Sequence, residues 1–228
     1  MHITFTNVSG VDVTTDKPIP ASQAIPEWYK STLSYISGEK KPKGNGEGEA
    51  TIKKCMPVFD SMTSGYLILL PADIYVSPKE GEPYFQWSNL GLISFHVFEQ
   101  APIHPMKNGF NYPKLKNPWA IKTPKGYSCL IMQPTHRDLP FNIFPAVVDT
   151  DTYTDAINFP FVLKDPNFEG LIPAGTPIAQ IMPFKRESWK MQIGNEKDFI
   201  QTMQVANKLQ RKFFDRYKTM FWTKKEYT

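Results

Sequence analysis

Between residues 51 and 184 the chain consists of short apolar stretches separated by Pro, Gly, Asp and Asn, and this pattern limits the fold most strongly. The stretches are rich in Ile, Val, Leu, Phe and Tyr, which favour strands. No segment between them has the spacing of a long helix, and the 21 Pro of the chain argue against long helices there. Strands are expected at residues 65–70, 74–77, 84–88, 93–98, 120–122, 128–132, 146–150, 157–163 and 178–184.

The expected organisation is a single mainly β domain over residues 1–228, because a β barrel of this length commonly folds undivided. Residues 1–50 form an N-terminal extension with a strand at 3–13, a short helix opening at 25–30 and a flexible polar loop at 38–50. Residues 51–194 form the β core.

Residues 195–225 differ from the rest and predict one C-terminal amphipathic α-helix. From residue 196 to 222 there is no Gly or Pro, and apolar residues recur at steps of three and four over about seven turns. Asn195 is the expected N-cap. Residues 195–228 hold eight basic and four acidic residues, which account for the chain's net charge of +4. We expect this helix to pack on the barrel with its basic face in solvent; the alternative is contact with an acidic partner or nucleic acid.

Several classes of protein are excluded by the same composition. No apolar run reaches the roughly 18 residues of a membrane-spanning helix, and no basic and apolar leader opens the chain, so a cytoplasmic protein is expected. The neutral main body argues against nucleic acid as a partner. Cys55 and Cys129 are expected to be buried thiols, and whether they pair is left open.

Three central segments carry the chemistry that the sequence offers. Residues 119–134 place a Pro-Lys-Gly turn before an apolar strand, and residues 171–182 place a Pro-Ala-Gly turn before a strand that contains Gln180. Between them, a buried-type strand ends in Asp149 and Asp151. A carboxylate beside bound water can act as a general base. The structural alternative is that both acids accept backbone hydrogen bonds at a turn.

In this order and spacing, the three segments resemble motifs of the dUTPase and dCTP deaminase superfamily, a β-clip fold. The resemblance implies a dUTPase-like barrel of short strands and a homo-oligomer, because these relatives build their sites between subunits. It implies that Asp149 activates water, that Asp151 is a second, structural acid, and that Gln180 arranges the phosphate site. Tyr153 matches the family's aromatic residue if Thr152 is counted as an insertion.

The chain also departs from that family. Where the family has Arg-Ser-Ser, this chain has residues 133–137, in which His136 and Arg137 are the groups assigned to an anion. At the position of the family's early Asp this chain has Leu67, and at the position of the family's Asp-Arg it has Thr-Pro, residues 176–177. Hydrolysis of a triphosphate would therefore lack most of its charge stabilisation.

A second resemblance spans most of the length. Residues 25–30, 51–57, 117–119, 149–153 and 157–161 look like an uncharacterised family that is frequent in tailed phages. It implies a protein of the infected host cell or of the virion and supplies no activity.

The function expected from these features is a phage-associated β-clip protein that binds or acts on a nucleotide-like or phosphorylated small molecule. Asp149 would be the base or the metal–phosphate contact, and Mg²⁺ is expected only if the ligand is a nucleotide. No dedicated metal site is expected, since no Cys-x-x-Cys pair occurs and the His residues are not clustered with other ligands. The alternative is a non-enzymatic virion component or an inhibitor of a host protein, acting through the basic C-terminal helix.

Overall fold

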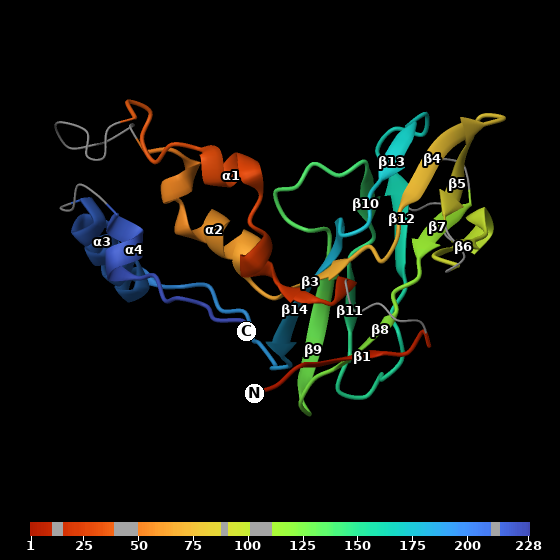
Figure 1. Ribbon diagram of the computed structural model, residues 1–228. Helices are drawn as coiled ribbons and strands as arrows, with labels where there is room; N and C mark the ends of the chain where they lie inside the picture. The colour runs from red at the N-terminus through yellow and green to blue at the C-terminus, as the bar shows by residue number, and fades with distance from the viewer. Residues whose placement is uncertain (11–15, 39–49, 88–90, 101–110, 211–214) are drawn as a thin grey trace. The chain divides into compact units, whose positions relative to one another are not determined.

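The computed structural model describes residues 1–10, 16–38, 50–87, 91–100, 111–210 and 215–228 (Figure 1). These residues group into two compact units. The first, which we call the β unit, contains residues 1–21 and 65–186, and the second, the helical unit, contains residues 22–64 and 187–228. The expectation of one domain over the whole chain stays a prediction.

The β unit is built from short antiparallel strands, which confirms the mainly β fold. The described strands form four sheets, in the orders β1-β8, β10-β12-β7-β6, β11-β9-β14-β3-β2 and β13-β4-β5. Their bounds are β1 (Thr4–Asn7), β2 (Ile19–Pro20), β3 (Tyr66–Leu69), β4 (Ile74–Lys79), β5 (Glu82–Trp87), β6 (Ile93–His96), β7 (Tyr112–Leu115), β8 (Trp119–Lys122), β9 (Tyr127–Met132), β10 (Phe141–Ile143), β11 (Ala146–Val148), β12 (Phe159–Leu163), β13 (Gly170–Ile172) and β14 (Pro177–Lys185).

All the core strands expected from the sequence are present, with ends that differ by a few residues. Four further strands were not expected: β2, β7, β10 and β13. Three of them are only two or three residues long, and β7 contains Pro113, which weakens the strand signal. Residues 11–15 of the expected first strand lie outside the described residues.

The core of the β unit joins side chains from several sheets. Ile68, Val76 and Ile181 are fully buried within one apolar cluster. Phe161 lies edge-on to Phe85 and Phe141, with ring centroids 5.7 and 5.6 Å apart, and so links β12 to β5 and β10. Each fully buried side chain of this size contributes about 1.5–3 kcal/mol to folding, so this cluster fixes the strands that carry the candidate site.

The helical unit contains α1 (Glu27–Ser31), the 3-10 helix η3 (Ile52–Lys54), α2 (Met56–Thr63), α3 (Glu196–Gln210) and α4 (Arg216–Met220). Of two further 3-10 helices, η2 (Ala21–Ala24) begins at the last residue of the first β-unit segment, and η4 (Phe98–Gln100) belongs to the β unit. The short helix expected after Pro26 is confirmed as α1. Of the expected loop at 38–50, residues 39–49 lie outside the described residues.

The β core was predicted to begin at residue 51, but residues 51–64 form η3 and α2 and group with the helical unit. Pro57 lies in the first turn of α2, where its missing N–H costs no hydrogen bond. Met56, Phe59 and Met62 repeat at steps of three, and Met56 and Met62 are buried.

The C-terminal helix is also corrected. Asn195 caps α3 as expected, since its side-chain oxygen accepts from the backbone N–H of Lys197 at 2.9 Å. A single helix cannot continue to residue 222, because Asp215 has a left-handed backbone with φ of 51°. Lys54 Nζ lies 2.7 Å from Asp215 Oδ1, a tertiary contact that helical spacing does not reveal. The apolar face of α3, expected to be buried, is exposed at Phe199 and Met203.

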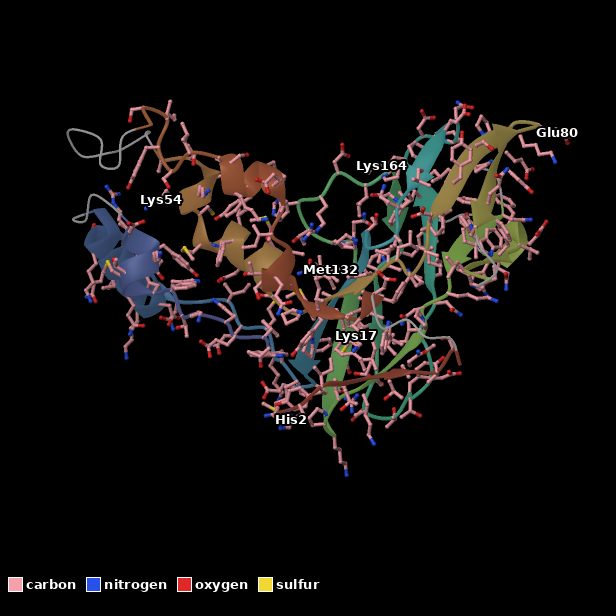
Figure 2. All side chains as sticks on the ribbon, in the orientation of Figure 1. His2, Lys17, Lys54, Glu80, Met132 and Lys164 are labelled. Carbon is pink, nitrogen blue, oxygen red and sulfur yellow. The ribbon has the colours of Figure 1, made fainter. Side chains whose placement is uncertain are left out.

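The segment after α4 is held to α2 within the helical unit. Trp222 Nε1 donates to both carboxylate oxygens of Asp60 at 3.0 Å, and Lys225 Nζ lies 2.7 Å from Asp60 Oδ2. Figure 2 draws the side chains of this unit, including Lys54. Asp60 therefore joins the end of the chain to a helix 162 residues earlier.

Two smaller expectations can be checked directly. Both cysteines are free; Cys129 is buried, whereas Cys55 is exposed, contrary to expectation. Within the described part of the chain, no helix is long and apolar enough to cross a membrane.

Candidate functional site

Three segments of the β unit meet at the start of β9. In the five-stranded sheet β9 lies between β11 and β14 (Figure 1). Val148 of β11 pairs with Cys129, and Lys185 of β14 pairs with Tyr127. Because both neighbours are antiparallel to β9, the residues that follow β11 and β14 are brought to the turn that precedes β9.

That turn has the geometry that the Pro-Lys-Gly motif predicts. Tyr127 N donates to Pro124 O at 3.2 Å, and Gly126 has φ of +87°, which a side chain would disfavour. The carbonyl oxygen of Gly126 accepts from Arg186 N at 2.8 Å, and its N–H donates to Asp151 Oδ2 at 2.8 Å. Gly126 thus ties the two neighbouring segments to the turn.

Arg186 binds both of the acids that the sequence singled out. Its Nη1 lies 2.8 Å from Asp151 Oδ1 and 3.1 Å from Asp149 Oδ1, and its Nη2 donates to Asp151 Oδ2. Ser128 Oγ donates to Asp149 Oδ1 at 2.7 Å and accepts from Arg186 Nη1 at 3.1 Å. We call Ser128, Asp149, Asp151 and Arg186 the carboxylate–arginine cluster.

The two carboxylates of the cluster differ in exposure. The side chain of Asp151 is 3% exposed, whereas that of Asp149 is 62% exposed. Every contact that the described residues make with the Asp149 carboxylate ends on Oδ1, which leaves Oδ2 to solvent or a ligand. Asp151 is therefore placed to support the cluster, and Asp149 is placed to meet a ligand.

The electrostatics of the cluster keep both acids ionised. The hydrogen bonds from Arg186 and from the Gly126 N–H lower the pKa of Asp151 to about 2. The hydrogen bond from Ser128, followed by that from Arg186, lowers the pKa of Asp149. The same ion pairs, Asp151 first, raise the pKa of Arg186. A carboxylate with a lowered pKa is a weak general base but a good acceptor for hydroxyl groups and a good contact for cations.

The other predicted site residues lie elsewhere on the same sheet. Gln180 pairs with Met132, four residues along β9 from Ser128, and such a stretch of strand spans about 13 Å. The buried side chain of Gln180 accepts from Thr135 N at 3.1 Å and so holds the turn that contains His136. Within one chain, the end of β9 that carries Gln180 and His136 is thus separate from the end that carries Asp149.

Arg137 follows His136 at that second end and is half-buried. Burial lowers the pKa of its guanidinium. Tyr153, in contrast, lies beside the cluster: its N–H donates to Asp149 O at 2.9 Å, and its ring is half exposed. Of the predicted residues, the structure brings together Asp149, Asp151 and Tyr153.

Sequence reasoning missed Arg186 and Ser128. Arg186 lies just after the expected strand 178–184, and only the pairing of β14 with β9 brings it to Asp151. A signal was present, since a strand ending in Lys-Arg beside a strand ending in two acids favours opposite-charge pairing. Within the described residues, no group of three or more His, Cys, Asp or Glu could hold a metal ion.

No family model matches the chain, and no curated protein matches it. Solved structures similar to it include dUTPases. EIAV dUTPase is 12% identical over 58% of this chain and 84% of its own, with a TM-score of 0.33. The dUTPase from phage phi11 of S. aureus is 13% identical, covers 72% of this chain and 94% of its own, and has a TM-score of 0.32.

A mutant of Staphylococcus bacteriophage 80alpha dUTPase with dUpNHpp is likewise 13% identical, covers 72% of this chain and 86% of its own, and has a TM-score of 0.33. At such identities and TM-scores the likeness carries no argument about activity. The chain is mainly β, its central motifs resemble those of dUTPases, and the solved structures similar to it include dUTPases.

Proposed function

We propose that this is a phage-encoded protein that binds a nucleotide-like or other phosphorylated small molecule at the carboxylate–arginine cluster. The single observation that carries the proposal is the state of Asp149, which is exposed and ionised. Its Oδ1 is fixed by Ser128 and Arg186, and Oδ2 is left open. A fixed acceptor of this kind recognises a hydroxyl group, such as that of a sugar, with little loss of side-chain freedom.

The phosphate groups of such a ligand require a cation. The cluster holds two carboxylates and one guanidinium, so its net charge is negative and it does not attract phosphate directly. Mg²⁺ is commonly held by one or two carboxylates together with ligand phosphates and water, and Asp149 offers one such carboxylate oxygen. The exposed ring of Tyr153 beside Asp149 adds an apolar surface for a base or sugar.

The same charges favour binding over hydrolysis. Arg186 is neutralised by Asp149 and Asp151, and no second cation joins the cluster among the described contacts. The charge that develops on a phosphate in the transition state would therefore lack stabilisation. His136, Arg137 and Gln180 could add positive charge and donors only from the other end of β9. A joint site with them requires a second copy of the chain, which is consistent with the expected homo-oligomer.

Thermal unfolding with a panel of nucleoside mono-, di- and triphosphates, with and without Mg²⁺, tests the proposal. A true ligand at 100 times its Kd stabilises the chain by about 2.7 kcal/mol. Asp149→Asn should abolish this stabilisation, because the amide keeps the shape of the side chain but not its charge. The matched control is Asp138→Asn, an exposed acid paired with Lys164, which should bind as the unchanged chain does. If Asp149→Asn also binds unchanged, the proposal fails.

A second candidate function is favoured by a separate observation. Trp189, Met191 and Ile193 lie two residues apart in a segment of the helical unit without regular secondary structure, and they are 86%, 93% and 86% exposed. Three large apolar residues left in water in one short segment are typical of a protein-binding surface. This supports a non-enzymatic virion component or an inhibitor of a host protein.

The second candidate is tested by affinity purification from infected cells. A protein partner should co-purify with the unchanged chain and be lost when Trp189, Met191 and Ile193 are all replaced by Ser. Nucleotide stabilisation should survive in that triple variant, so the two candidate functions fail independently. Recovery of the same partner with the triple variant would contradict the second candidate.

A further inference from the structure

The strand β5 has one open side. Among the described strands it pairs only with β4, at the end of the sheet β13-β4-β5 (Figure 1). A pocket of about 380 Å³ adjoins it. The pocket contacts the exposed face of β5 at Glu82 and Tyr84 and the opposite face at Phe85 and Trp87. Because successive side chains of a strand point to opposite faces, a pocket that touches both faces runs along the open edge.

The register of the β4–β5 hairpin shows which backbone groups face that open edge. Pro78 and Pro83 lie opposite each other, and neither has an N–H. They therefore form a pair without hydrogen bonds, and such pairs alternate with hydrogen-bonded pairs along an antiparallel ladder. By this alternation the N–H and C=O groups of Phe85 and Trp87, and the C=O of Pro83, point away from β4. Among the described residues, none outside the hairpin hydrogen-bonds to these groups.

The turn of the hairpin supports the same assignment independently. The two residues at its tip, Glu80 and Gly81, have φ of 53° and 85°, as in a two-residue type I′ turn. A hydrogen bond between the flanking residues, Lys79 and Glu82, closes such a turn. The pair after it is then one without hydrogen bonds, which is the position of the two prolines.

Apolar residues of other strands form the core side of the pocket. Phe85 is buried, and its ring lies 6.2 Å from that of Phe95 in β6. Phe95 is 49% exposed, so part of an aromatic ring remains in water there. The other described walls are Asn111, Pro113 of β7 and Leu163 at the end of β12. A strand added beside β5 would direct every second side chain, on the face of Phe85, against these walls.

The charges around the pocket favour an uncharged occupant. Glu82 is the one charged residue among the described lining residues. Lys79 lies opposite Glu82 in the hairpin, and its Nζ is 5.1 Å from the centre of the Tyr84 ring, so a neighbouring base balances this acid. A charged side chain placed against Phe85 and Phe95 would lose water without gaining a counter-charge. Apolar side chains complement walls of this kind.

We infer that the open edge of β5 binds an extended, uncharged segment of another protein as an added antiparallel strand. Backbone hydrogen bonds to Phe85 and Trp87 supply affinity, and apolar side chains at alternate positions, seated in the pocket, supply specificity. Antiparallel pairing is the more stable arrangement per residue. No residue of the carboxylate–arginine cluster takes part.

The β5 strand of a second copy is a poorer occupant of this edge. In the longest two-fold pairing that the outward groups of β5 allow, Phe85 lies opposite its own copy and Pro83 lies opposite Trp87 at both ends. Because Pro83 has no N–H, two carbonyl groups would then lack donors. A segment without Pro at the pairing positions avoids this loss at its own residues.

Hydrogen exchange of the full chain, measured in ¹H–¹⁵N spectra, first tests whether the edge is open. The backbone N–H groups of Tyr84 and Gln86 point to β4 and should exchange slowly. Those of Phe85 and Trp87 should exchange at least about tenfold faster. Equal protection of all four groups would show that the edge is already covered and would overturn the inference.

Seven-residue peptides in which Thr alternates with Val, Leu, Ile, Phe or Tyr then serve as probes. The peptide that binds best should protect the N–H groups of Phe85 and Trp87, with a saturable dependence on its concentration. In an antiparallel pair, a peptide residue whose side chain lies beside Phe85 also turns its N–H to β5. N-methylation of the apolar peptide residues should therefore weaken binding about tenfold or more, and N-methylation of the Thr residues should not. If no peptide protects these groups, or both methylation patterns weaken binding equally, the inference fails.

Two proline substitutions test the edge itself. Pro83→Ala adds the N–H that the open edge lacks, so peptide binding should strengthen about threefold through one further hydrogen bond. Pro78→Ala is the matched control, because it makes the same change in the same hairpin but on the side of β4 that faces away from β5. The dispersion of the same spectra verifies that both variants are folded. Unchanged binding in Pro83→Ala, or an equal gain in Pro78→Ala, would contradict the assigned direction of these groups.

Dilution of the chain separates the inferred occupant from a second copy. Without peptide, the exchange rates of the Phe85 and Trp87 N–H groups should not depend on the concentration of the chain. Protection that rises with that concentration would assign the edge to a second copy and overturn the inference.

Discussion

Arg186 and Asp151 form a two-point ion pair across 35 residues of sequence: Nη1 lies 2.8 Å from Oδ1, and Nη2 donates to Oδ2. Two parallel hydrogen bonds fix the guanidinium in the plane of the carboxylate, which a single contact does not. Because Gly126 N also donates to Asp151, this acid joins the end of β14 to the turn before β9. We therefore assign to Asp151 the support of the site, and to Asp149 the contact with a ligand.

The stability of the β unit should depend on pH through Asp151. Its pKa is about 2 in the folded chain and near 3.8 without these partners. A group whose pKa is depressed by folding stabilises the fold above its unfolded pKa, and that contribution is lost as the pH falls through the folded pKa. Thermal midpoints should therefore fall from about pH 4 toward pH 2. In Asp151→Asn this part of the decline should be absent, and an identical pH profile would contradict the assignment.

Removal of Arg186 should destabilise the chain more than removal of the Asp149 charge. Arg186→Met leaves the nearly buried Asp151 carboxylate without its counter-charge, whereas Asp149→Asn changes a side chain that is 62% exposed. Arg186→Lys should fall between them, because an ammonium cannot make the two-point contact. Thermal unfolding at pH 7 gives the order.

The Arg186 comparison should be repeated near pH 2. There Asp151 becomes half protonated, so the difference between Arg186→Met and the unchanged chain should shrink. A difference that stays constant down to that pH would show that Arg186 acts through packing of its side chain and not through its charge.

Local patterns were sufficient to predict most of the strands but not the contacts between them. The strand at 146–150 and the acids after it were identified from the motif alone. The partner of those acids, Arg186, depends on the register of β14 with β9, and a chain segment does not encode register by itself. For the same reason, Gln180 was grouped with Asp149 by motif, although four residues of β9 separate their positions.

At the C-terminal helix, in contrast, the local sequence pattern was clear and still predicted the wrong structure. Nothing between residues 196 and 222 breaks a helix by composition, because both Gly and Pro are absent. Asp215, the described residue just before α4, has a left-handed backbone, which Asp tolerates better than most residues, and it is paired with Lys54. Helical spacing predicts the conformation that a segment favours by itself. An ion pair with a residue distant in sequence can favour a different conformation.

Gly65 should be the glycine of the β unit that is most sensitive to substitution. Its φ is +76°, and a Cβ there would overlap the carbonyl oxygen of Ile181 in the neighbouring β14. Gly65→Ala should therefore cost about 3 kcal/mol or more, measured by denaturant unfolding.

Gly81→Ala is the matched control for Gly65→Ala. Gly81 also has a positive φ, of +85°, but a Cβ there meets nothing within 4 Å, so the cost should be about 1–2 kcal/mol. The excess for Gly65→Ala measures the overlap with β14. Equal costs for the two variants would show that backbone conformation alone explains both.

Asp60 should control whether the end of the chain stays bound to α2. Its carboxylate is 15% exposed and accepts from Trp222 Nε1 and Lys225 Nζ. Asp60→Ala removes the acceptor of both hydrogen bonds and should lower the free energy of local opening by about 1–3 kcal/mol. Faster hydrogen exchange of the Trp222 indole N–H would report this loss. Asp60→Asn keeps an acceptor for Trp222 but not the ion pair, so its exchange rate should be intermediate.

Glu226→Gln, which affects only an exposed pair with Lys224, should leave this exchange unchanged. If Asp60→Ala also leaves it unchanged, the Asp60 contacts do not hold the end of the chain.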